Sequence, residues 1–128
     1  MLKAFGSVAG TIAGGGTGSD PQVTTVITWN SLSGSVSGGL GGVGVFAYAD
    51  ITGPITAAGE IYAATWGAIS APILGTGADQ SVEVFARTDV SANMTSAGNL
   101  IVTAGGDVSG IMQAGSGTSH NVSVSALG

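Results

Sequence analysis

Few side chains in this chain of 128 residues could do chemistry, and most of them are aspartates. Arg87 lies close to Asp89, and Asp107 opens a segment, "DVSGIM", that repeats the "DVSANM" around Asp89. Two carboxylates that meet in a fold repel each other, and either bound calcium or free solvation would relieve the repulsion. An arginine beside them would add a basic group to such a site.

Asp50 belongs to the same group, because it opens the related segment "DITGPI". An aspartate at a chain reversal also accepts a backbone N–H and thereby shapes the corner. One copy of the segment has Ala68 at this point, so the corner forms without the carboxylate. We therefore predict that Asp50, Asp89 and Asp107 form turns. Calcium is the one cofactor that they would suit, and no dedicated metal site is predicted.

The remaining candidates for chemistry lie in glycine-rich loops. The single histidine, His120, falls in "GSGTSHN", which resembles "GTGSDPQ" with Asp20 and "GTGADQS" with Asp79. These loops do not belong to adjacent repeats, so we predict glycine-rich turns and no shared metal site. The chain has no cysteine, which removes disulfides and Cys-based zinc sites. We predict no catalytic residue.

Composition excludes two classes of partner. Only Lys3 and Arg87 are cations, against seven acidic residues, so the chain lacks the basic surface that nucleic acids and anionic membranes require. It also lacks the uninterrupted apolar run of about 18 residues that a membrane-spanning helix needs, so we expect no membrane insertion. Apolar residues make up 44% of the chain, which is too much for disorder driven by polarity and charge.

A five-residue pattern repeats six times along the chain: an apolar residue, a hydroxyl or alanine, a small residue, any residue, and another apolar one. Its first positions are Val8, Leu32, Ile51, Ile69, Val90 and Val108. Its fifth positions are Ile12, Val36, Ile55, Ile73, Met94 and Met112. This regularity is the signature of a stacked repeat protein.

A second apolar arm lies eight residues before each of the last five patterns. These arms start at Thr24, Val43, Ile61, Val82 and Leu100, and a sixth starts at Val122. Only the connection from the fifth position to the arm varies in length, which predicts variable loops on one edge and a minimum repeat of 18 residues.

Glycine and β-branched residues dominate, and stretches such as "SVEVFA" alternate with a period of two, so helix is rejected. Identical patterns in successive coils place like residues above like, which a parallel stack achieves and a hairpin sheet does not. The fold class predicted is all-β, a single-domain parallel β-solenoid of about six coils. Residues 1–7 form an N-terminal lead-in or cap, and residues 8–128 form the repeats, with coils starting near 8, 32, 51, 69, 90 and 108.

The alternation also predicts what faces outward. If Val43, Val45 and Ala47 point inward, Phe46 and Tyr48 point outward. Applied to the other arms, this register gathers the aromatics on one face. It predicts a column of Trp29, Tyr48, Trp66 and Arg87 stacked along the axis, with the guanidinium over an aromatic ring. The predicted interaction face is Trp29, Phe46, Tyr48, Tyr62, Trp66, Phe85 and Arg87. A local loop that covers this face, or tryptophans that point inward, is the alternative.

Units such as "DITGPITAAGEI" and "TSAGNLIVTAGGDVSG" resemble the Gly/Asp-rich repeats of very large secreted bacterial surface proteins of the planctomycete type. More distantly, they resemble filamentous-haemagglutinin-like solenoids. The resemblance covers about residues 8–128. It implies an extracellular or cell-surface stalk, adhesin or matrix component, and it carries no catalytic residue across.

Other solenoid classes fit less well. Hexapeptide acyltransferases share the 18-residue coil but need a catalytic histidine, and His120 lies in a loop of the last coil. Ice-binding solenoids present aligned Thr-x-Thr arrays, whereas Thr25 is followed two places on by Ile27. Solenoid polysaccharide lyases use a basic residue near calcium-binding carboxylates, for which Arg87 with the aspartates is the candidate.

We therefore predict a non-enzymatic structural or self-assembling module of an extracellular surface or filament protein. Its partner is another copy of itself, met laterally at the aromatic face or axially, where the coil that starts at Val108 meets the coil that starts at Val8 of the next copy. The alternative to axial docking is that the chain is an excised middle portion of a longer solenoid. The alternative is an extracellular polysaccharide-binding or lyase-like β-helix domain, with a glycan as partner.

Overall fold

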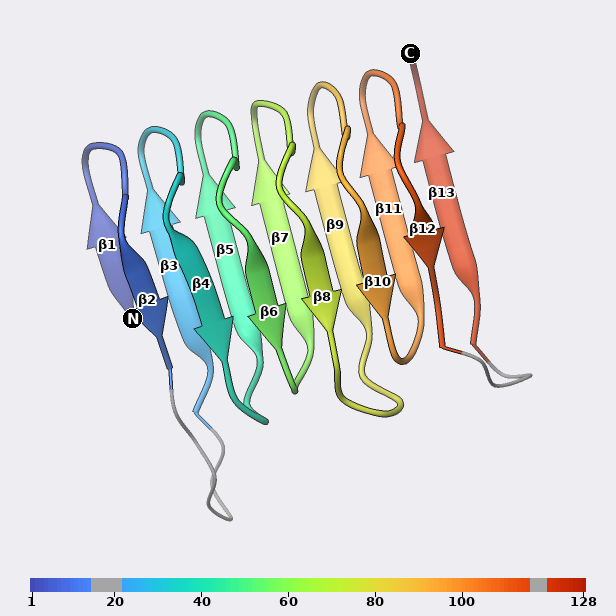
Figure 1. Cartoon of the computed structure of the whole chain (residues 1–128). Coiled ribbons are helices and arrows are strands. Elements are labelled where there is room, and N and C mark those ends of the chain that lie inside the picture. Colours follow the sequence, from blue (N-terminus) through green and yellow to red (C-terminus); the bar gives the residue numbers. More distant parts are fainter. Residues whose placement is uncertain (15–21, 116–119) are drawn as a thin grey trace.

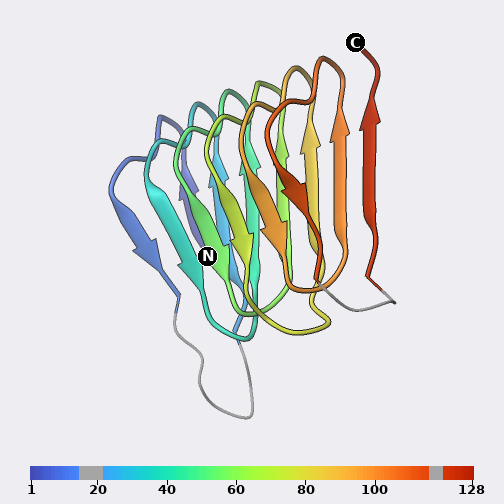
Figure 2. The ribbon, with the colours of Figure 1, turned by 45° about the vertical axis from the view of Figure 1, so that its right-hand side comes forward.

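The computed structural model describes residues 1–14, 22–115 and 120–128, and the regular structure in these ranges is all β-strand (Figure 1). One sheet has seven strands: β1 (Leu2–Ala4), β3 (Thr24–Thr28), β5 (Val43–Ala47), β7 (Ile61–Thr65), β9 (Val82–Ala86), β11 (Leu100–Ala104) and β13 (Val122–Ala126). The other has six: β2 (Thr11–Ala13), β4 (Ser35–Gly38), β6 (Ile55–Ala57), β8 (Ile73–Gly75), β10 (Met94–Ser96) and β12 (Met112–Gln113). Figure 2 shows the two sheets as the two layers of one continuous winding.

Neighbouring strands pair in parallel and join residues one coil apart. In the middle of the stack, Val45 pairs with Ala63, and Ala63 pairs with Val84. A line of single bridges also runs along one corner, through the first residues of the repeat pattern: Val8, Leu32, Ile51, Ile69, Val90 and Val108. The predicted parallel β-solenoid of about six coils, all-β and in a single domain, is therefore confirmed.

The core consists of stacked aliphatic columns. The first and fifth positions of the pattern are fully buried in the middle coils, as Ile51 and Ile55 show. The arm strands add a second pair of columns, in which Val45 and Ala63 are adjacent members. Each large aliphatic side chain buried in this way contributes about 1.5–3 kcal/mol. The repeat pattern thus builds a narrow core in which each coil contributes a few side chains from both sheets.

The small third residue of the pattern is required by a close approach of consecutive coils. A Cβ added at Gly53 would lie 2.0 Å from the carbonyl oxygen of Gly34, and one at Gly34 would lie 2.1 Å from that of Gly10. Gly10 and Gly110 also have φ angles of 96° and 110°, which residues with a side chain rarely adopt. Ala71 and Ala92 occupy this position in two other coils, so the corner requires a small residue throughout and glycine where the coils approach most closely.

The described connections that vary in length lie on one edge of the solenoid, between β4 and β5, β6 and β7, β8 and β9, and β10 and β11 (Figure 1). This agrees with the prediction. Residues 1–7, expected as a lead-in or cap, contribute β1. Leu2 pairs with Val26 and Ala4 with Thr28, so the lead-in extends the seven-stranded sheet by one strand.

Candidate functional site

The outer face of the seven-stranded sheet carries the predicted interaction face. On β5, Val45 and Ala47 are buried, whereas Phe46 between them is 42% exposed. Tyr62 on β7 and Phe85 on β9 are exposed by the same alternation. The other members lie just beyond the ends of their strands, at the corner where the chain turns toward the six-stranded sheet. The structure thus brings all seven residues to one face, and its use as an interaction face stays a prediction.

A column of stacked rings runs along this corner, and the stack expected from the sequence is present. The Trp29 and Tyr48 rings are 4.6 Å apart at 9°, and the Tyr48 and Trp66 rings are 6.4 Å apart at 14°. The Arg87 guanidinium carbon lies 4.7 Å from the Trp66 ring centroid, within the range of a cation–π contact. Rings one coil apart stack because the parallel register places them directly above one another.

Phe5 extends this column, and sequence reasoning missed it. Its ring lies 6.2 Å from that of Trp29 at 13°. The signal was present, because Phe5 precedes Trp29 by the same 24 residues that separate Val8 from Leu32. Residues 1–7 were treated as a lead-in, so the register was not carried back to them.

Buried threonine hydroxyls hold the two tryptophans in place. Thr28 Oγ1 donates to the carbonyl of Gly6 at 2.6 Å, and the Asn30 amide donates to the same hydroxyl at 3.3 Å. Thr65 Oγ1 donates likewise to the carbonyl of Ala49 and accepts the Gly67 amide. Both threonines are fully buried and immediately precede a tryptophan. The hydroxyls therefore pin the corners from which Trp29 and Trp66 project.

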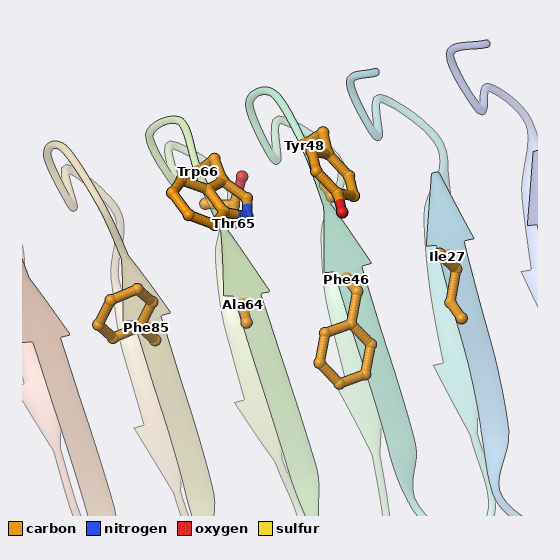
Figure 3. A pocket seen from close by; sticks show the side chains of 8 residues that line it. Ile27, Phe46, Tyr48, Ala64, Thr65, Trp66 and Phe85 are labelled. Carbon is orange, nitrogen blue, oxygen red and sulfur yellow. The ribbon is translucent and has the colours of Figure 1, made fainter. Parts of the chain in front are cut away.

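An apolar groove of about 480 Å³ lies beside the column (Figure 3). Ala64 lies at the same register as Phe46 on one side and Phe85 on the other, so its small side chain leaves a depression between two rings. Tyr48 and Trp66 border the groove toward the corner, as Figure 3 shows. Ala64 therefore forms the floor of a recess that is wide enough for an apolar side chain of a partner.

A second, more polar hollow of about 370 Å³ adjoins the groove on the same sheet. Glu60, Glu83 and Tyr62 line it, and Gly44 forms part of its surface. The Phe46 ring packs 5.4 Å from the Tyr62 ring. The interaction face therefore combines an apolar groove with an adjacent hollow that is lined by two glutamates.

Two of the three aspartates predicted to form turns, Asp50 and Asp89, link consecutive coils. Asp50 Oδ1 accepts the Ala68 amide at 2.8 Å, and Asp89 Oδ1 accepts the Asp107 amide at 2.9 Å. Each donor belongs to the next coil, 18 residues on, so the carboxylate ties two coils together at the corner. Asn93 and Asn99 make equivalent links through their side-chain oxygens.

A glycine accompanies each linking aspartate in the next coil. A Cβ at Gly67 would lie 2.3 Å from Asp50 Oδ1, and one at Gly106 would lie 2.0 Å from Asp89 Oδ1. Where the preceding coil has Ala68 instead, the equivalent position holds the bulkier Thr88. The glycines therefore make room for the carboxylates.

The lyase-like arrangement of Arg87 with two aspartates is not assembled as a cluster. Arg87 lies over Trp66, while Asp89 is engaged with the Asp107 backbone. Within residues 1–14, 22–115 and 120–128, no group of three or more potential metal-ligating side chains comes together. Calcium binding by Asp50, Asp89 or Asp107 stays a prediction.

Two of the glycine-rich loops are joined by a side-chain contact. His120 Nε2 lies 3.0 Å from Asp79 Oδ1, although their loops belong to coils that are not adjacent. The connection between β10 and β11, which lies between them, is only residues 97–99, so it leaves room for the longer neighbours to reach each other. The absence of a shared metal site stays a prediction, and sequence reasoning did not anticipate this contact between the two loops. Asp20 lies outside the described residues.

Comparison with models of known protein families, with curated proteins and with solved structures finds no match to this chain. The described residues contain no helix long and apolar enough to cross a membrane. The solenoid architecture is therefore established by the structure itself, and the resemblance to repeats of secreted bacterial surface proteins stays an expectation.

Proposed function

We propose that this chain is a non-enzymatic structural module that associates with further copies of itself, within an extracellular or cell-surface protein. The observation that carries the proposal is the exposed aromatic face. Trp29, Tyr48 and Trp66 are each at least half exposed and adjoin an apolar groove. A lone domain rarely leaves a contiguous apolar patch in water, so such a patch marks an interaction surface.

The orientation of the rings favours a protein partner over a glycan. A sugar ring stacks flat on an aromatic face, but the faces of Trp29 and Tyr48 cover each other at 4.6 Å. Their edges therefore point to solvent. The groove above Ala64 suits an apolar side chain, because Phe46, Phe85 and Trp66 form its walls.

The polysaccharide-binding alternative rests on the neighbouring hollow. There the Tyr62 ring lies near the carboxylates of Glu60 and Glu83, which can accept hydrogen bonds from sugar hydroxyls. A lyase-like role would in addition need Arg87 to act as a base, and its guanidinium stays charged in proteins. This alternative predicts monomers that bind acidic or neutral polysaccharides.

The repeat pattern supports axial association. Inside the chain, like residues of successive coils pair in parallel, as Val90 and Val108 do. An exposed strand edge of a sheet templates the pairing of another strand. A second copy that continues the stack would pair in the same parallel register.

The extracellular location is the part of the proposal that rests on the sequence alone. It follows from the resemblance to secreted repeat proteins, and the lack of cysteine is compatible with export. A reporter fused to the chain in the producing cell, followed by fractionation of the medium and the cell surface, would test it. Recovery in the cytoplasm alone would contradict it.

The test of the lateral contact is the mass of the protein over about two decades of concentration, because association obeys mass action. Wild type should grow with concentration, and the Tyr48→Ser/Trp66→Ser variant should grow less while keeping its β-rich circular dichroism. Leu74→Ser, an exposed apolar position on the six-stranded sheet, is the matched control and should behave as wild type. A wild type that stays monomeric, and binds polysaccharide through the same residues, would favour the alternative.

Axial association is tested by a cap. A proline-containing charged segment appended after Gly128 should suppress it without unfolding the coils, because proline cannot donate to the ladder. Association that persists unchanged in the capped chain would refute the axial contact and leave the lateral one.

A further inference from the structure

The middle of the outer face is a regular grid of side chains, because equal positions of successive coils lie side by side. On β5, β7, β9 and β11 the second and fourth residues of each strand point outward. The second residue beyond each strand continues the grid at the corner, as Tyr48, Trp66 and Arg87 show. These strands are flanked by β3 and β13, so the grid lies inside the stack.

The recess at Ala64 is the feature of this grid that a partner has to fill. Ala64 lies between Phe46 and Phe85 of the neighbouring strands, as Figure 3 shows. Sheets that pack face to face interdigitate their side chains, and a cavity left between them is destabilising. A second copy of the same face carries suitable apolar side chains, namely its own phenylalanine rings.

We infer that two copies pack face to face about a two-fold axis that runs along the strands between β7 and β9, an inference that rests on the proposed lateral self-association. The rotation reverses the order of the strands, so that β7 faces β9 of the partner and β5 faces β11. Phe85 of each copy then enters the recess at Ala64 of the other copy. In such a symmetric interface every contact between unlike residues occurs twice.

The other positions of these strands also match in this register. A larger residue meets a smaller one in three further pairs, which are Ile101 with Gly44, Phe46 with Thr103, and Tyr48 with Gly105. Gly105 occupies the corner position of its coil, because its amide donates to the carbonyl of Ala86 as the amide of Arg87 donates to that of Thr65. Projections of one copy therefore lie over depressions of the other.

The two charged residues of the grid, Glu83 and Arg87, each meet an attractive group. Glu83 faces Tyr62 of the other copy, because the two residues occupy the same position on β9 and β7. The phenol hydroxyl can donate a charge-assisted hydrogen bond to the carboxylate. Arg87 faces the Trp66 ring of the other copy and already lies 4.7 Å from its own. Both charges thus keep favourable surroundings in the dimer.

An axis between β5 and β7 would also fill the recess, with Phe46 in place of Phe85. It would, however, set Tyr48 against Trp66, and Ile27 against Phe85. Opposition of large side chains holds the two faces apart, so the small positions beside them stay unfilled. This register therefore packs less closely than the one between β7 and β9.

An axis parallel to the solenoid would place the two Ala64 residues opposite each other and leave both recesses empty. It would pair Glu83 with Arg87 of the other copy. An ion pair at the exposed rim of an interface contributes little, whereas an empty cavity is costly. Size complementarity therefore decides for the axis along the strands.

A mixture of two single variants tests the register. Ala64→Phe opposes two rings, and Phe85→Ala leaves the recess empty, so each variant alone should raise the concentration for half-assembly about tenfold or more. In the mixed dimer the ring added at position 64 meets the alanine at position 85, and the second contact is that of wild type. The mixture should therefore assemble within about threefold of the wild-type concentration, roughly half of one tenfold step in affinity. Each chain carries one substitution, so the rescue arises between chains.

A second pair of variants applies the same test elsewhere in the interface. Phe46→Thr and Thr103→Phe should each weaken association and should rescue each other when mixed. Circular dichroism shows whether each variant is folded, and this pair decides the question if Ala64→Phe or Phe85→Ala is not. Absence of rescue in folded variants of an associating protein would overturn the inference.

Two control mixtures identify the other registers. Ala64→Phe with Phe46→Ala restores both contacts only if the axis lies between β5 and β7. Glu83→Arg with Arg87→Glu restores both ion pairs only if the axis is parallel to the solenoid. Rescue in either control would overturn the proposed register and leave the proposed self-association standing. A wild type that stays monomeric at every concentration would remove both.

Discussion

Replacement of Gly106 by alanine should destabilise the solenoid, because the added methyl group would collide with the carboxylate of Asp89. An added Cβ would lie 2.0 Å from Asp89 Oδ1, closer than any real contact. The carboxylate would have to move and give up the Asp107 amide, which it now accepts at 2.9 Å. The φ of Gly106 lies outside the left-handed region, so the alanine itself is not strained.

The magnitude follows from these contacts. Loss of one partly exposed, charge-assisted hydrogen bond together with mild overpacking costs about 1–2 kcal/mol in the free energy of unfolding. Asp89→Ala alone loses the bond without the clash and should cost about 1 kcal/mol. In the Asp89→Ala background, Gly106→Ala should then be much less costly, because the severe clash is gone and only the Thr88 carbonyl carbon, 3.1 Å from the added Cβ, stays close.

One pair of coils in the chain is a natural counterpart of the double variant, because it lacks both the aspartate and the glycine. In the coil where Ala68 replaces the aspartate, the next coil carries Thr88 at the position equivalent to Gly106. A residue larger than alanine is therefore tolerated there once the carboxylate is absent. This supports a coupling between the two positions of about 1 kcal/mol, within the range found for residues in contact.

The assay is urea unfolding followed by circular dichroism for wild type, both single variants and the double variant. Gly44→Ala, which meets nothing within 4 Å and lies on β5, is the control and should be neutral or stabilising by about 0.4–1 kcal/mol. Strictly additive effects of the Asp89 and Gly106 substitutions would refute the reasoning, because the clash would then not involve that carboxylate.

Three further predictions concern the interaction face. Thr65→Val keeps the shape of a buried side chain but leaves the carbonyl of Ala49 and the Gly67 amide without their partner, so it should cost about 2–4 kcal/mol in urea unfolding; the exposed Thr56→Val is the control, and equal effects would mean that the Thr65 hydroxyl bonds are unimportant. Arg87→Met removes the cation from the ring of Trp66 and should cost about 0.5–1 kcal/mol and change the tryptophan emission; an unchanged spectrum would argue against a persistent contact in solution. Ala64→Lys puts a long charged side chain into the groove and should abolish lateral association with the fold intact, as analytical ultracentrifugation and circular dichroism would show; association as strong as in wild type would place the lateral contact elsewhere.

The sequence alone determined the fold and all of the outward aromatic face except Phe5. Residues such as Val45 and Ala63 could be aligned without a structure, because a parallel stack places equal positions of the repeat above one another. The same register predicted that Phe46 and Phe85 lie on the outward side of their strands, since side chains alternate between the two faces along a strand. Periodicity is a local property of the chain, and a repeat fold carries it directly into three dimensions.

The tertiary structure decided what periodicity does not encode. The meeting of His120 and Asp79 depends on the path of loops that do not repeat, and the groove above Ala64 depends on a gap between rings contributed by two other coils. The extra strand β1, too short to show the pattern, makes the two sheets unequal. Such features arise from contacts between segments whose positions are set only when the whole stack has formed, and for this reason they could not be read from the repeats.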